Sequence, residues 1–248
     1  MAIKKRIDTL LVEKGFCQSR ERAKVMIANG RVLVNRLPCH KPGSQFPDEV
    51  SIAVRGDDLP YVSRGGLKLE AALLANGIEC SGTICLDVGA STGGFTDCLL
   101  QHGAARVFAV DVGYGQLAWS LRQDARVTVI ERTNIRTIDP ALINQPIDIA
   151  TIDTSFISLK RVIPSTLPFL KAGAILLALI KPQFEAGKGR VGKGGVVKDP
   201  ALHAAIIDDL RRFFSGLSLV CGPVTPSPVL GPRGNKEFMI LLQRPDSG

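Results

Sequence analysis

Two ionisable residues each follow a strongly apolar stretch of this sequence. Asp153 ends the run IDIATID, and Lys181 follows the run AILLALI. A buried strand rarely ends on an unshielded charge unless a partner or a ligand lies there. Active sites of open α/β sheets lie outside the carboxyl ends of the strands. A lysine at such a place can act as a base when another cation is nearby and the site is partly dry. The alternative is an ordinary surface salt bridge.

A glycine turn offers a second candidate for chemistry. The segment ICLDVGASTGGFTD places an apolar stretch before Asp87 and Gly89, and then Gly93 and Gly94 at the start of a helix. Glycines there let the backbone approach a ligand closely, and a helix N-terminus offers free N–H groups to a carboxylate or phosphate. The spacing differs from the G-x-G-x-x-G of dinucleotide sites.

Two polar residues follow the next apolar stretches. Asp111 comes roughly 20 residues further on, where it can accept both ribose hydroxyls of a cofactor. Asn134 lies just beyond the third stretch, where such folds contact adenine. The alternative interpretation is that Asp87 and Asp111 are helix caps or turn residues and that Asn134 is an ordinary turn residue.

A glycine-rich loop, GKGRVGKGG at residues 187–195, satisfies both a loose G-x-G-x-x-G and the first seven positions of a P-loop. We reject both interpretations, because Gly194 stands where a P-loop needs Ser or Thr and no strand runs directly into the loop. A basic lid near the substrate, using Lys188, Arg190 and Lys193, is favoured over an incidental solvated loop.

These candidates require a sheet whose strands end at one edge. From residue 66 onward, strand and helix patterns alternate, as in a doubly wound parallel sheet. The last two strands have no helix between them, so we expect an antiparallel edge. The expected strands are 84–88, 106–110, 127–130, 147–152, 174–180, 217–224 and 237–242, and the expected helices are 66–76, 93–102, 116–123, 159–170 and 201–215.

The front of the chain has a different pattern. Two helices, the second at 19–28, precede two short β-rich stretches at 31–34 and 50–54, with a Pro/Gly-containing loop at 37–47 between them. This pattern predicts a small α+β module. The expected domains are residues 1–58 and 66–248, joined by a polar linker at 59–65.

The composition fits a compact globular protein, with 45% hydrophobic and 22% charged residues. The net charge is +8, of which the first 64 residues hold +5, from 12 Lys and Arg against 7 Asp and Glu. A polyanionic partner is therefore indicated. The cysteines and histidines lack ligand spacing, so we expect no metal site. No secretory signal or membrane-length apolar run is seen, so we expect a cytoplasmic protein that does not act on membranes.

Family motifs extend this interpretation. The glycine turn resembles motif I of S-adenosylmethionine methyltransferases. Lys68 in SRGGLKL and Glu237 in GNKEFMI, with Asp153 and Lys181, give an ordered set that resembles the tetrad of FtsJ-like ribose 2'-O-methyltransferases. Essentially the whole chain is similar to the TlyA family, because RIDTLLVEKGFCQSRERAKVMIANGRVLVN resembles its S4 RNA-binding domain and YVSRGGLKL its junction. LDVGASTGGFTD, DTSFISL, IKPQFE and GGVVKD resemble its catalytic motifs.

The resemblance implies a Rossmann-like class I methyltransferase fold, seven-stranded and mostly parallel, behind a small S4 α+β domain. It also implies S-adenosylmethionine as cofactor and the 2'-hydroxyl of a cytidine in ribosomal RNA as substrate. The short segment before the first helix favours the large subunit, and modification of the small subunit as well stays open. The expected cofactor-binding residues are Asp87, Gly89, Ser91, Gly93, Gly94, Phe95, Asp111 and Asn134.

In this scheme Lys181 activates the hydroxyl, and Lys68 tunes it electrostatically and positions the substrate. Asp153 and Glu237 hold the two lysines in place. The sulfonium charge disappears on methyl transfer, so the scheme needs no metal.

Basic residues of the front module suit phosphate contacts on structured RNA. Aromatic residues are nearly absent there, which favours recognition of shape and backbone over base stacking. Ordinary solvated faces are the alternative. The expected RNA-binding residues are Arg6, Arg20, Arg22, Lys24, Arg31 and Arg64, together with the three basic residues of the glycine-rich loop.

Three other functions are weighed against this one. Some members of the family are called haemolysins, so a membrane-acting protein is one alternative, although no amphipathic or spanning segment supports it. A non-catalytic RNA-binding ribosome-assembly factor is another. A nicotinamide oxidoreductase is the weakest, because the glycine spacing argues against it.

Overall fold

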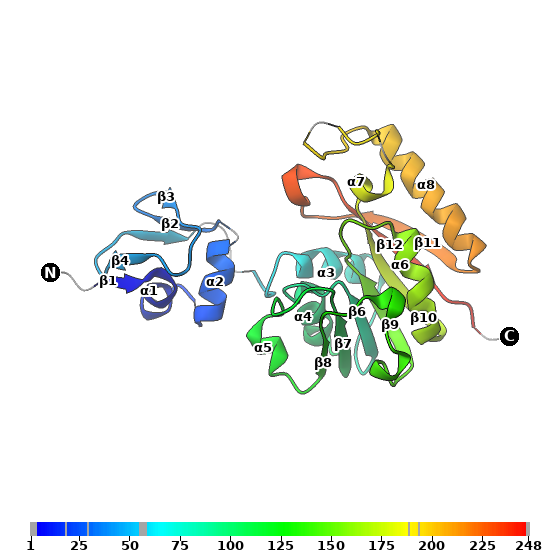
Figure 1. The fold of residues 1–248 in the computed structure, drawn as a ribbon, viewed down its shortest axis with the longest axis horizontal. Helices are drawn as coiled ribbons and strands as arrows, with labels where there is room; N and C mark the ends of the chain where they lie inside the picture. The colour runs from blue at the N-terminus through cyan, green and yellow to red at the C-terminus, as the bar shows by residue number, and fades with distance from the viewer. Residues whose placement is uncertain are drawn as a thin grey trace. The chain divides into compact units, whose positions relative to one another are not determined.

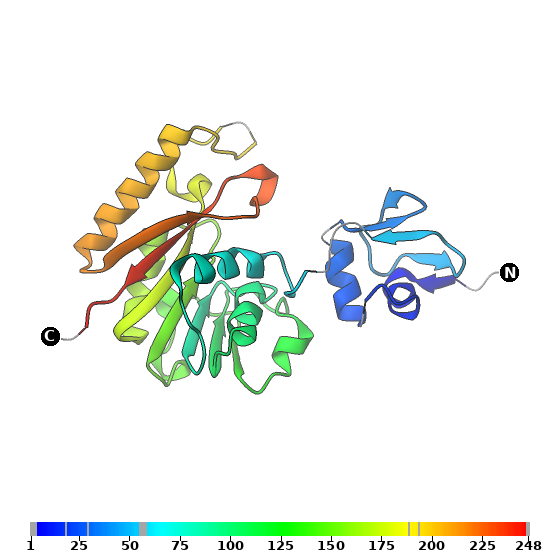
Figure 2. The same ribbon diagram turned by 180° about the vertical axis from the view of Figure 1, so that it is seen from behind.

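A computed structural model of the chain describes residues 4–17, 19–28, 30–54, 59–187, 189–192 and 194–246. The chain forms two compact units, Met1–Ser63 and Arg64–Gly248, both drawn in Figure 1 and, from behind, in Figure 2. The boundary falls inside the stretch 59–65 that the sequence assigns to the linker. Each unit has its own hydrophobic core.

Unit 1 packs two helices, α1 (Ile7–Glu13) and α2 (Arg20–Ala28), with two small sheets. β2 (Val32–Val34) lies between β3 (Leu37–Pro38) and β5 (Ile52–Val54), and β1 (Lys4–Arg6) pairs with β4 (Gln45–Pro47). The strands β3 and β4 lie in the stretch expected to be a loop. Strands of two or three residues are too short to show an alternating pattern in sequence.

Unit 2 contains a seven-stranded sheet in the order β11-β12-β10-β9-β6-β7-β8. β12 runs antiparallel to both of its neighbours, and the other strand pairs are parallel. The predicted fold class, with its antiparallel edge, is confirmed. The strands are β6 (Ile84–Val88), β7 (Arg106–Val110), β8 (Val127–Ile130), β9 (Ile147–Ile152), β10 (Leu170–Ile180), β11 (Val220–Pro226) and β12 (Phe238–Gln243).

Helices cover this sheet. α3 contacts α4, β11 and β12, whereas α6 contacts α8 and β10. The helices are α3 (Gly65–Asn76), α4 (Gly94–Gln101), α5 (Trp119–Arg122), α6 (Leu159–Thr166), α7 (Pro182–Glu185) and α8 (Pro200–Gly216). Short 3-10 turns are η1 (Ile135–Thr137), η2 (Pro140–Leu142), η3 (Leu167–Phe169) and η4 (Pro232–Gly234).

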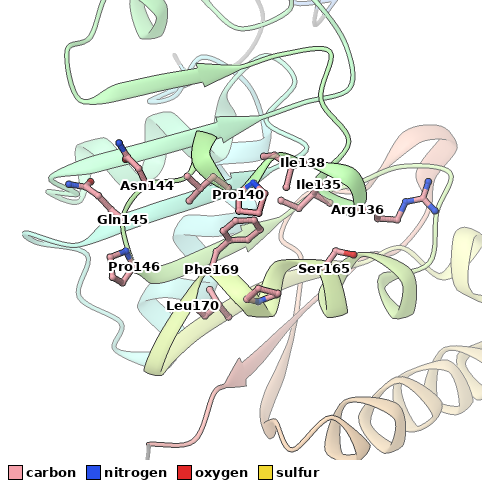
Figure 3. A pocket seen from close by; sticks show the side chains of 12 residues that line it. Ile135, Arg136, Ile138, Pro140, Asn144, Gln145, Pro146, Ser165, Phe169 and Leu170 are labelled. Carbon is pink, nitrogen blue, oxygen red and sulfur yellow. The ribbon is translucent and has the colours of Figure 1, made fainter.

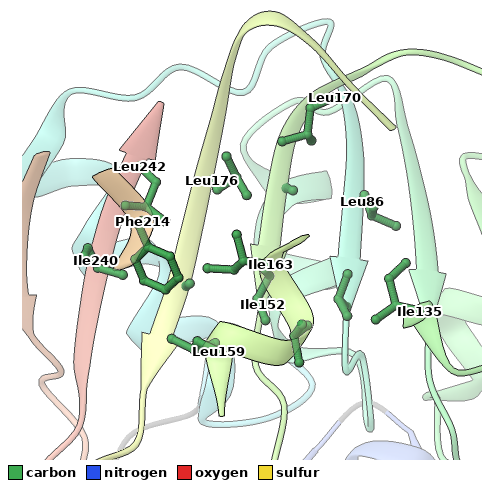
Figure 4. Packing of buried hydrophobic residues seen from close by; sticks show 14 of the residues in the cluster. Leu86, Ile135, Ile152, Leu159, Ile163, Leu170, Leu176, Phe214, Ile240 and Leu242 are labelled. Atoms are coloured by element: carbon green, nitrogen blue, oxygen red, sulfur yellow. The ribbon is translucent and has the colours of Figure 1, made fainter. Parts of the chain in front are cut away.

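The core of unit 2 joins the sheet to α6 and α8. Figure 4 shows Leu176 and Ile152 on neighbouring strands, with Leu159 and Ile163 of α6 and Phe214 of α8 packed against the sheet. All five side chains are at most 2% exposed. Burying a side chain of this size contributes ~1.5–3 kcal/mol, so this packing fixes the strands and hence the positions of their ends.

Candidate active site

Three parallel strands of the sheet end level with one another. Val88 of β6 is the register partner of Val110 in β7 and of Ile152 in β9. The residues that follow them are Gly89, Asp111 and Asp153. Because parallel strands point the same way, these residues lie along one edge, the carboxyl edge where ligands bind in open α/β sheets.

The antiparallel edge adds two more charges at the same place. Ile180 of β10 is the register partner of Phe238 in β12. Lys181 follows Ile180, and Glu237 precedes Phe238. Reversal of one strand therefore makes the end of β10 and the start of β12 neighbours, so Lys181 and Glu237 lie side by side.

The four predicted tetrad residues form two ion pairs. Lys181 Nζ lies 2.5 Å from Asp153 Oδ1 and donates to Ser155 Oγ at 2.9 Å. Lys68 Nζ, on α3, lies 2.6 Å from Glu237 Oε2. Lys181 is 8% exposed and Glu237 is 2% exposed. Burial weakens screening by water, so each carboxylate acts strongly on its lysine.

Glu237 depends on a glycine that sequence reasoning did not select. Its Oε1 is buried and has no hydrogen-bond partner within the described part of the chain. A Cβ built on Gly231 would lie 2.0 Å from this oxygen, so any side chain at that position would displace the carboxylate. This close fit holds the carboxylate against the turn, with its other oxygen on Lys68.

A cavity of about 540 Å³ opens beside Asp153. Four of the predicted cofactor residues line it, namely Gly89, Ser91, Asp111 and Asn134. A Cβ on Gly89, whose φ is +87°, would lie 2.6 Å from the carbonyl oxygen of Asp153, so close approach of two strand ends requires glycine here. The cavity therefore directly adjoins one of the two ion pairs.

Asp111 is held at the mouth of this cavity by backbone donors. Its Oδ2 accepts from the Ser91 amide at 2.7 Å, and its Oδ1 accepts from the Gly113 amide at 2.6 Å. Each carboxylate oxygen can accept a second hydrogen bond, so Asp111 can still receive two hydroxyls. The residue is only partly buried, which leaves it reachable.

Asn134 caps η1, where its Oδ1 accepts from the Arg136 amide at 3.1 Å. Its amide nitrogen remains as a donor toward a ring acceptor. The cap and the proposed ligand contact use different atoms of the same side chain, so the turn interpretation and the ligand interpretation are compatible.

The other four predicted cofactor residues are buried and do not line the cavity. Asp87 is fully buried and accepts from Thr96 Oγ1 at 2.7 Å and from Thr151 Oγ1 at 3.0 Å. Burial raises the pKa of Asp87 to about 7, against the opposing effect of the two hydroxyl donors. Its side chain joins β6, β9 and α4 and offers no surface to a ligand.

The buried glycines and Phe95 support the same turn. Phe95 is 3% exposed, and Gly94 begins α4. A Cβ on Gly93, whose φ is +99°, would lie 2.2 Å from Leu121 Cδ1. None of the three lines the cavity. They shape the turn, and any contact with the cofactor would come from backbone groups.

Sequence reasoning missed Phe156. This residue is 90% exposed, has a φ of +63°, and its ring centroid lies 5.0 Å from that of Phe184. A bulky residue with positive φ is strained, and such strain gathers at functional sites. The sequence pattern predicts that a phenylalanine just after a strand is buried in the core, so only the structure reveals that Phe156 is exposed. Ser155, which holds Lys181, and the cavity residues Gln116 and Arg136 were also missed.

Two predicted RNA-binding arginines have a structural partner in unit 1. Arg6 donates to both oxygens of Asp8, at 3.0 and 2.9 Å, and Arg20 donates to Asp8 Oδ2 at 3.0 Å. Hydrogen bonds from Arg6, opposed by burial, and then those from Arg20 lower the pKa of Asp8 to about 2. Both arginine side chains are still nearly half exposed, at 45% and 49%.

The remaining basic candidates differ in their surroundings. Arg22 donates to the Tyr61 carbonyl at 2.7 Å, and Lys24 lies 3.6 Å from Glu21. Arg31 is half-buried, whereas Arg64 and Arg190 are exposed. Lys188 and Lys193 lie outside the described residues.

A larger hollow lies away from this chemistry. It measures about 660 Å³ and is lined mainly by apolar side chains, with Pro140 beside Phe169 in Figure 3. It shares Ile135 and Arg136 with the cofactor cavity but contains no tetrad residue. Size alone therefore does not mark the site.

Among the described residues, no three His, Cys, Asp or Glu side chains gather as a metal site would require. Within the same residues, no helix combines the length and the apolar character needed to cross a membrane.

The sheet order, the glycine turn at the end of β6 and the carboxylate at the end of β7 define unit 2 as a class I methyltransferase domain that uses S-adenosylmethionine. The sequence model of FtsJ-like methyltransferases matches residues 61–244, and that of the S4 domain matches residues 5–47.

Known proteins match nearly the full chain. This chain is 46% identical over 244 residues to the 16S/23S rRNA (cytidine-2'-O)-methyltransferase TlyA of Mycobacterium tuberculosis. The match covers 98% of this chain and 91% of that protein. The chain is 39% identical over 235 residues to Hemolysin A of Brachyspira hyodysenteriae, covering 94% and 98%. A solved structure of a Streptococcus thermophilus protein, described as a candidate hemolysin, is 40% identical, covers 100% of this chain and 90% of that one, and has a TM-score of 0.77. The chain therefore belongs to the TlyA family of S4-containing FtsJ-like methyltransferases.

Proposed function

We propose that this chain transfers a methyl group from S-adenosylmethionine to the 2'-hydroxyl of a cytidine in ribosomal RNA. The observation that carries the proposal is the pair of adjacent ion pairs, Lys181 with Asp153 and Lys68 with Glu237, at the carboxyl edge beside the Asp111 cavity. The Mycobacterium tuberculosis relative is named for this reaction on 16S and 23S RNA. The large subunit, alone or with the small one, is therefore the proposed substrate, and the cytoplasm the proposed location.

The residues around the cavity fit the cofactor. Asp111 can accept the ribose hydroxyls, Asn134 can meet the adenine, and Gly89 leaves room for close approach. When bound, S-adenosylmethionine supplies an electrophilic methyl group. Asp153 lines the cavity and also contacts Lys181, so the proposed base lies next to the proposed cofactor site.

Lys181 would accept the proton of the 2'-hydroxyl as that oxygen bonds to the methyl carbon, while the bond from that carbon to the sulfur of S-adenosylmethionine breaks and leaves a neutral thioether. Its Nζ must hold a free electron pair at that moment. The carboxylate of Asp153 stabilises the ammonium as it forms, and the proton leaves to solvent afterwards. Lys68, whose side chain is partly exposed, can orient the ribose while Glu237 holds it in place.

Mapping of 2'-O-methyl groups tests the proposal. Ribosomal subunits would be incubated with purified protein and S-adenosylmethionine, and the RNA analysed by alkaline-hydrolysis protection and nucleoside mass spectrometry. We expect new 2'-O-methylcytidine at one or a few positions. Methylation of a base, or the absence of any new modification, would contradict the proposal.

A further inference from the structure

The turn that leads into Glu237 also holds the glycine-rich loop. Asn235, which is 2% exposed, accepts from the Val197 amide through Oδ1 at 3.1 Å. Its Nδ2 donates to the carbonyl oxygens of Gly195 and Pro232, both at 3.0 Å. One buried side chain thus joins two segments that lie about forty residues apart in the sequence.

Two more side chains hold the same stretch at the end of the glycine-rich loop. Arg233 donates to the Gly194 carbonyl at 2.7 Å, and His203 Nε2 lies 3.0 Å from the Val197 carbonyl. Val197 is itself 3% exposed within the core of unit 2. We call this set of contacts, made by Arg233, Asn235 and His203 to residues 194–197, the loop latch.

Asparagine is specifically suited to the centre of the latch. It offers one acceptor and two donors, and here Oδ1 and both amide hydrogens have partners. Aspartate would only accept, so it would face two carbonyl oxygens without a donor. An apolar side chain would leave the buried Val197 amide and the Gly195 carbonyl without these partners, whereas the Pro232 carbonyl would keep its bond from the Asn235 amide at 3.3 Å.

The same residue shapes the surroundings of Glu237. The carbonyl of Asn235 accepts from the Gly231 amide at 2.9 Å, which closes the turn. Gly231 is the residue whose missing side chain leaves room for Glu237 Oε1. Asn235 therefore contacts both the end of the loop and the turn that sets the position of the carboxylate.

We propose that Asn235 is a positioning residue that couples the glycine-rich loop to Glu237, so that RNA contacted by the loop is aligned with the Lys68–Glu237 pair. The inference rests on the proposed function for its catalytic part. Asn235 lies outside the cofactor cavity, so its effect is on RNA alignment and not on binding of S-adenosylmethionine.

Asn235→Ala tests the coupling in the full-length protein. The loop offers trypsin the sites Lys188, Arg190 and Lys193. Loosening of the loop's end should favour local opening of the backbone, which a protease requires for cleavage. We expect cleavage at these sites to be about tenfold faster, with about tenfold lower kcat/KM for ribosomal subunits, as loss of two or three buried hydrogen bonds implies. Calorimetry should give an unchanged Kd for S-adenosylmethionine.

Two matched variants make the test specific. Lys236→Ala changes the exposed neighbour of Asn235 and should behave as the wild type in all three assays. Arg233→Gly removes one latch bond and relieves a residue whose φ is +58°, so it should fold even if Asn235→Ala does not. We expect it to give a smaller change in the same direction, about threefold.

Unchanged loop cleavage and unchanged kcat/KM in Asn235→Ala would overturn the proposal. So would a loss of activity that follows a lower urea midpoint while loop cleavage stays at the wild-type rate, because that result would mean a purely structural role. A wild-type protein that transfers no methyl group would contradict the proposed function instead, and the trypsin comparison would still decide whether the latch holds the loop.

Discussion

Two lysine–aspartate pairs join β9 and β10, one pair at the start of the two strands and one just beyond their ends. Lys171 of β10 contacts Asp148 of β9 in the first pair, and Lys181 contacts Asp153 in the second. The Lys171 side chain is 52% exposed, whereas that of Lys181 is 9% exposed. The two pairs have the same residue types but differ in their suitability for catalysis, because only the Lys181–Asp153 pair is shielded from water and adjoins the cavity.

This contrast gives a matched test of the base. Lys181→Ala removes the only proposed proton acceptor, and we expect methyl transfer to fall by about 10²–10⁴-fold in tritium incorporation into ribosomal RNA. Lys171→Ala removes an exposed ion pair and should keep full activity. Equal activity of the two variants would refute the role of Lys181.

Asp87 should make stability depend on pH. Its pKa is about 7 in the folded protein, above the unfolded value of about 3.9, so the folded state binds more protons in that interval. Its contribution to the free energy of unfolding is therefore fully present below pH ~4 and is lost as pH rises through 7, by at most ~1.4 kcal/mol per pH unit.

Urea unfolding of the cofactor-free protein and of Asp87→Asn from pH 5 to pH 8 measures this effect. We expect the wild type to lose stability relative to the variant as pH rises, with the difference levelling off above pH 7. A difference that is constant over this interval would mean that Asp87 is ionised throughout.

The exposed ring of Phe156 invites a further test at the residue scale. An aromatic face beside the cavity can stack on a base, which contributes ~1–3 kcal/mol by alanine substitution. Both Phe156→Ala and Phe156→Gly should therefore raise the KM for RNA by about tenfold or more. Phe156→Gly should be the more stable of the two by ~1 kcal/mol, because glycine tolerates the positive φ. An unchanged KM in both would exclude stacking.

At the scale of elements, α7 and α6 are joined at the site. Glu185 accepts from Ser158 Oγ at 2.6 Å and from the Leu159 amide at 2.8 Å, so it caps α6 from α7, the short helix that follows Lys181. The contact between Phe156 and Phe184 of α7 joins the same two segments. The segments that carry Asp153 and Lys181 are thereby held together beyond the ends of their strands.

Removal of this cap should affect stability and activity together. Glu185→Ala leaves two donors without their acceptor, and we expect a loss of ~1–2 kcal/mol in urea unfolding and a lower kcat. Glu185→Gln keeps one acceptor and offers a donor to the serine hydroxyl, so it should stay close to the wild type. A larger loss in the glutamine variant than in the alanine variant would argue against a capping role.

At the scale of the whole molecule, unit 2 holds the cofactor cavity and unit 1 holds a disproportionate share of the positive charge. Every residue that lines the cofactor cavity lies between Val88 and Val162, inside unit 2. Unit 1 is about a quarter of the chain but carries +4 of its net charge of +8, from 11 Lys and Arg against 7 Asp and Glu. Part of that charge neutralises buried Asp8, so fewer cations of unit 1 are fully free for the proposed RNA contacts than the sequence count implies.

A chain limited to residues 64–248 should separate the two functions. We expect its Kd for S-adenosylmethionine to stay within about twofold of the full-length value, while its KM for ribosomal subunits rises by ~10²-fold or more because phosphate contacts are lost. Calorimetry and tritium incorporation would measure the two effects. Equal KM values would show that unit 1 does not bind the substrate.

Much of this organisation was readable from the sequence. The strands β6, β7, β8 and β9 have the predicted bounds, because strands buried on both faces are near-continuous apolar runs. The helix expected at 116–123 is only α5 (Trp119–Arg122), and the turn α7 was not anticipated, because short elements depend on tertiary contacts more than on local pattern.

The amino-acid sequence by itself determined the order of strands and helices along the chain, because burial of a strand on both faces imposes a run of apolar residues. It also determined which charged residue follows which strand, because the charges interrupt those runs. Only the tertiary structure decided which of those charges meet. Pairing of Lys68 with Glu237, the exposure of Phe156, the burial of Asp87 and the use of Arg6 and Arg20 by Asp8 all depend on contacts between distant segments. Such contacts are set by strand register and packing, and no local pattern records them.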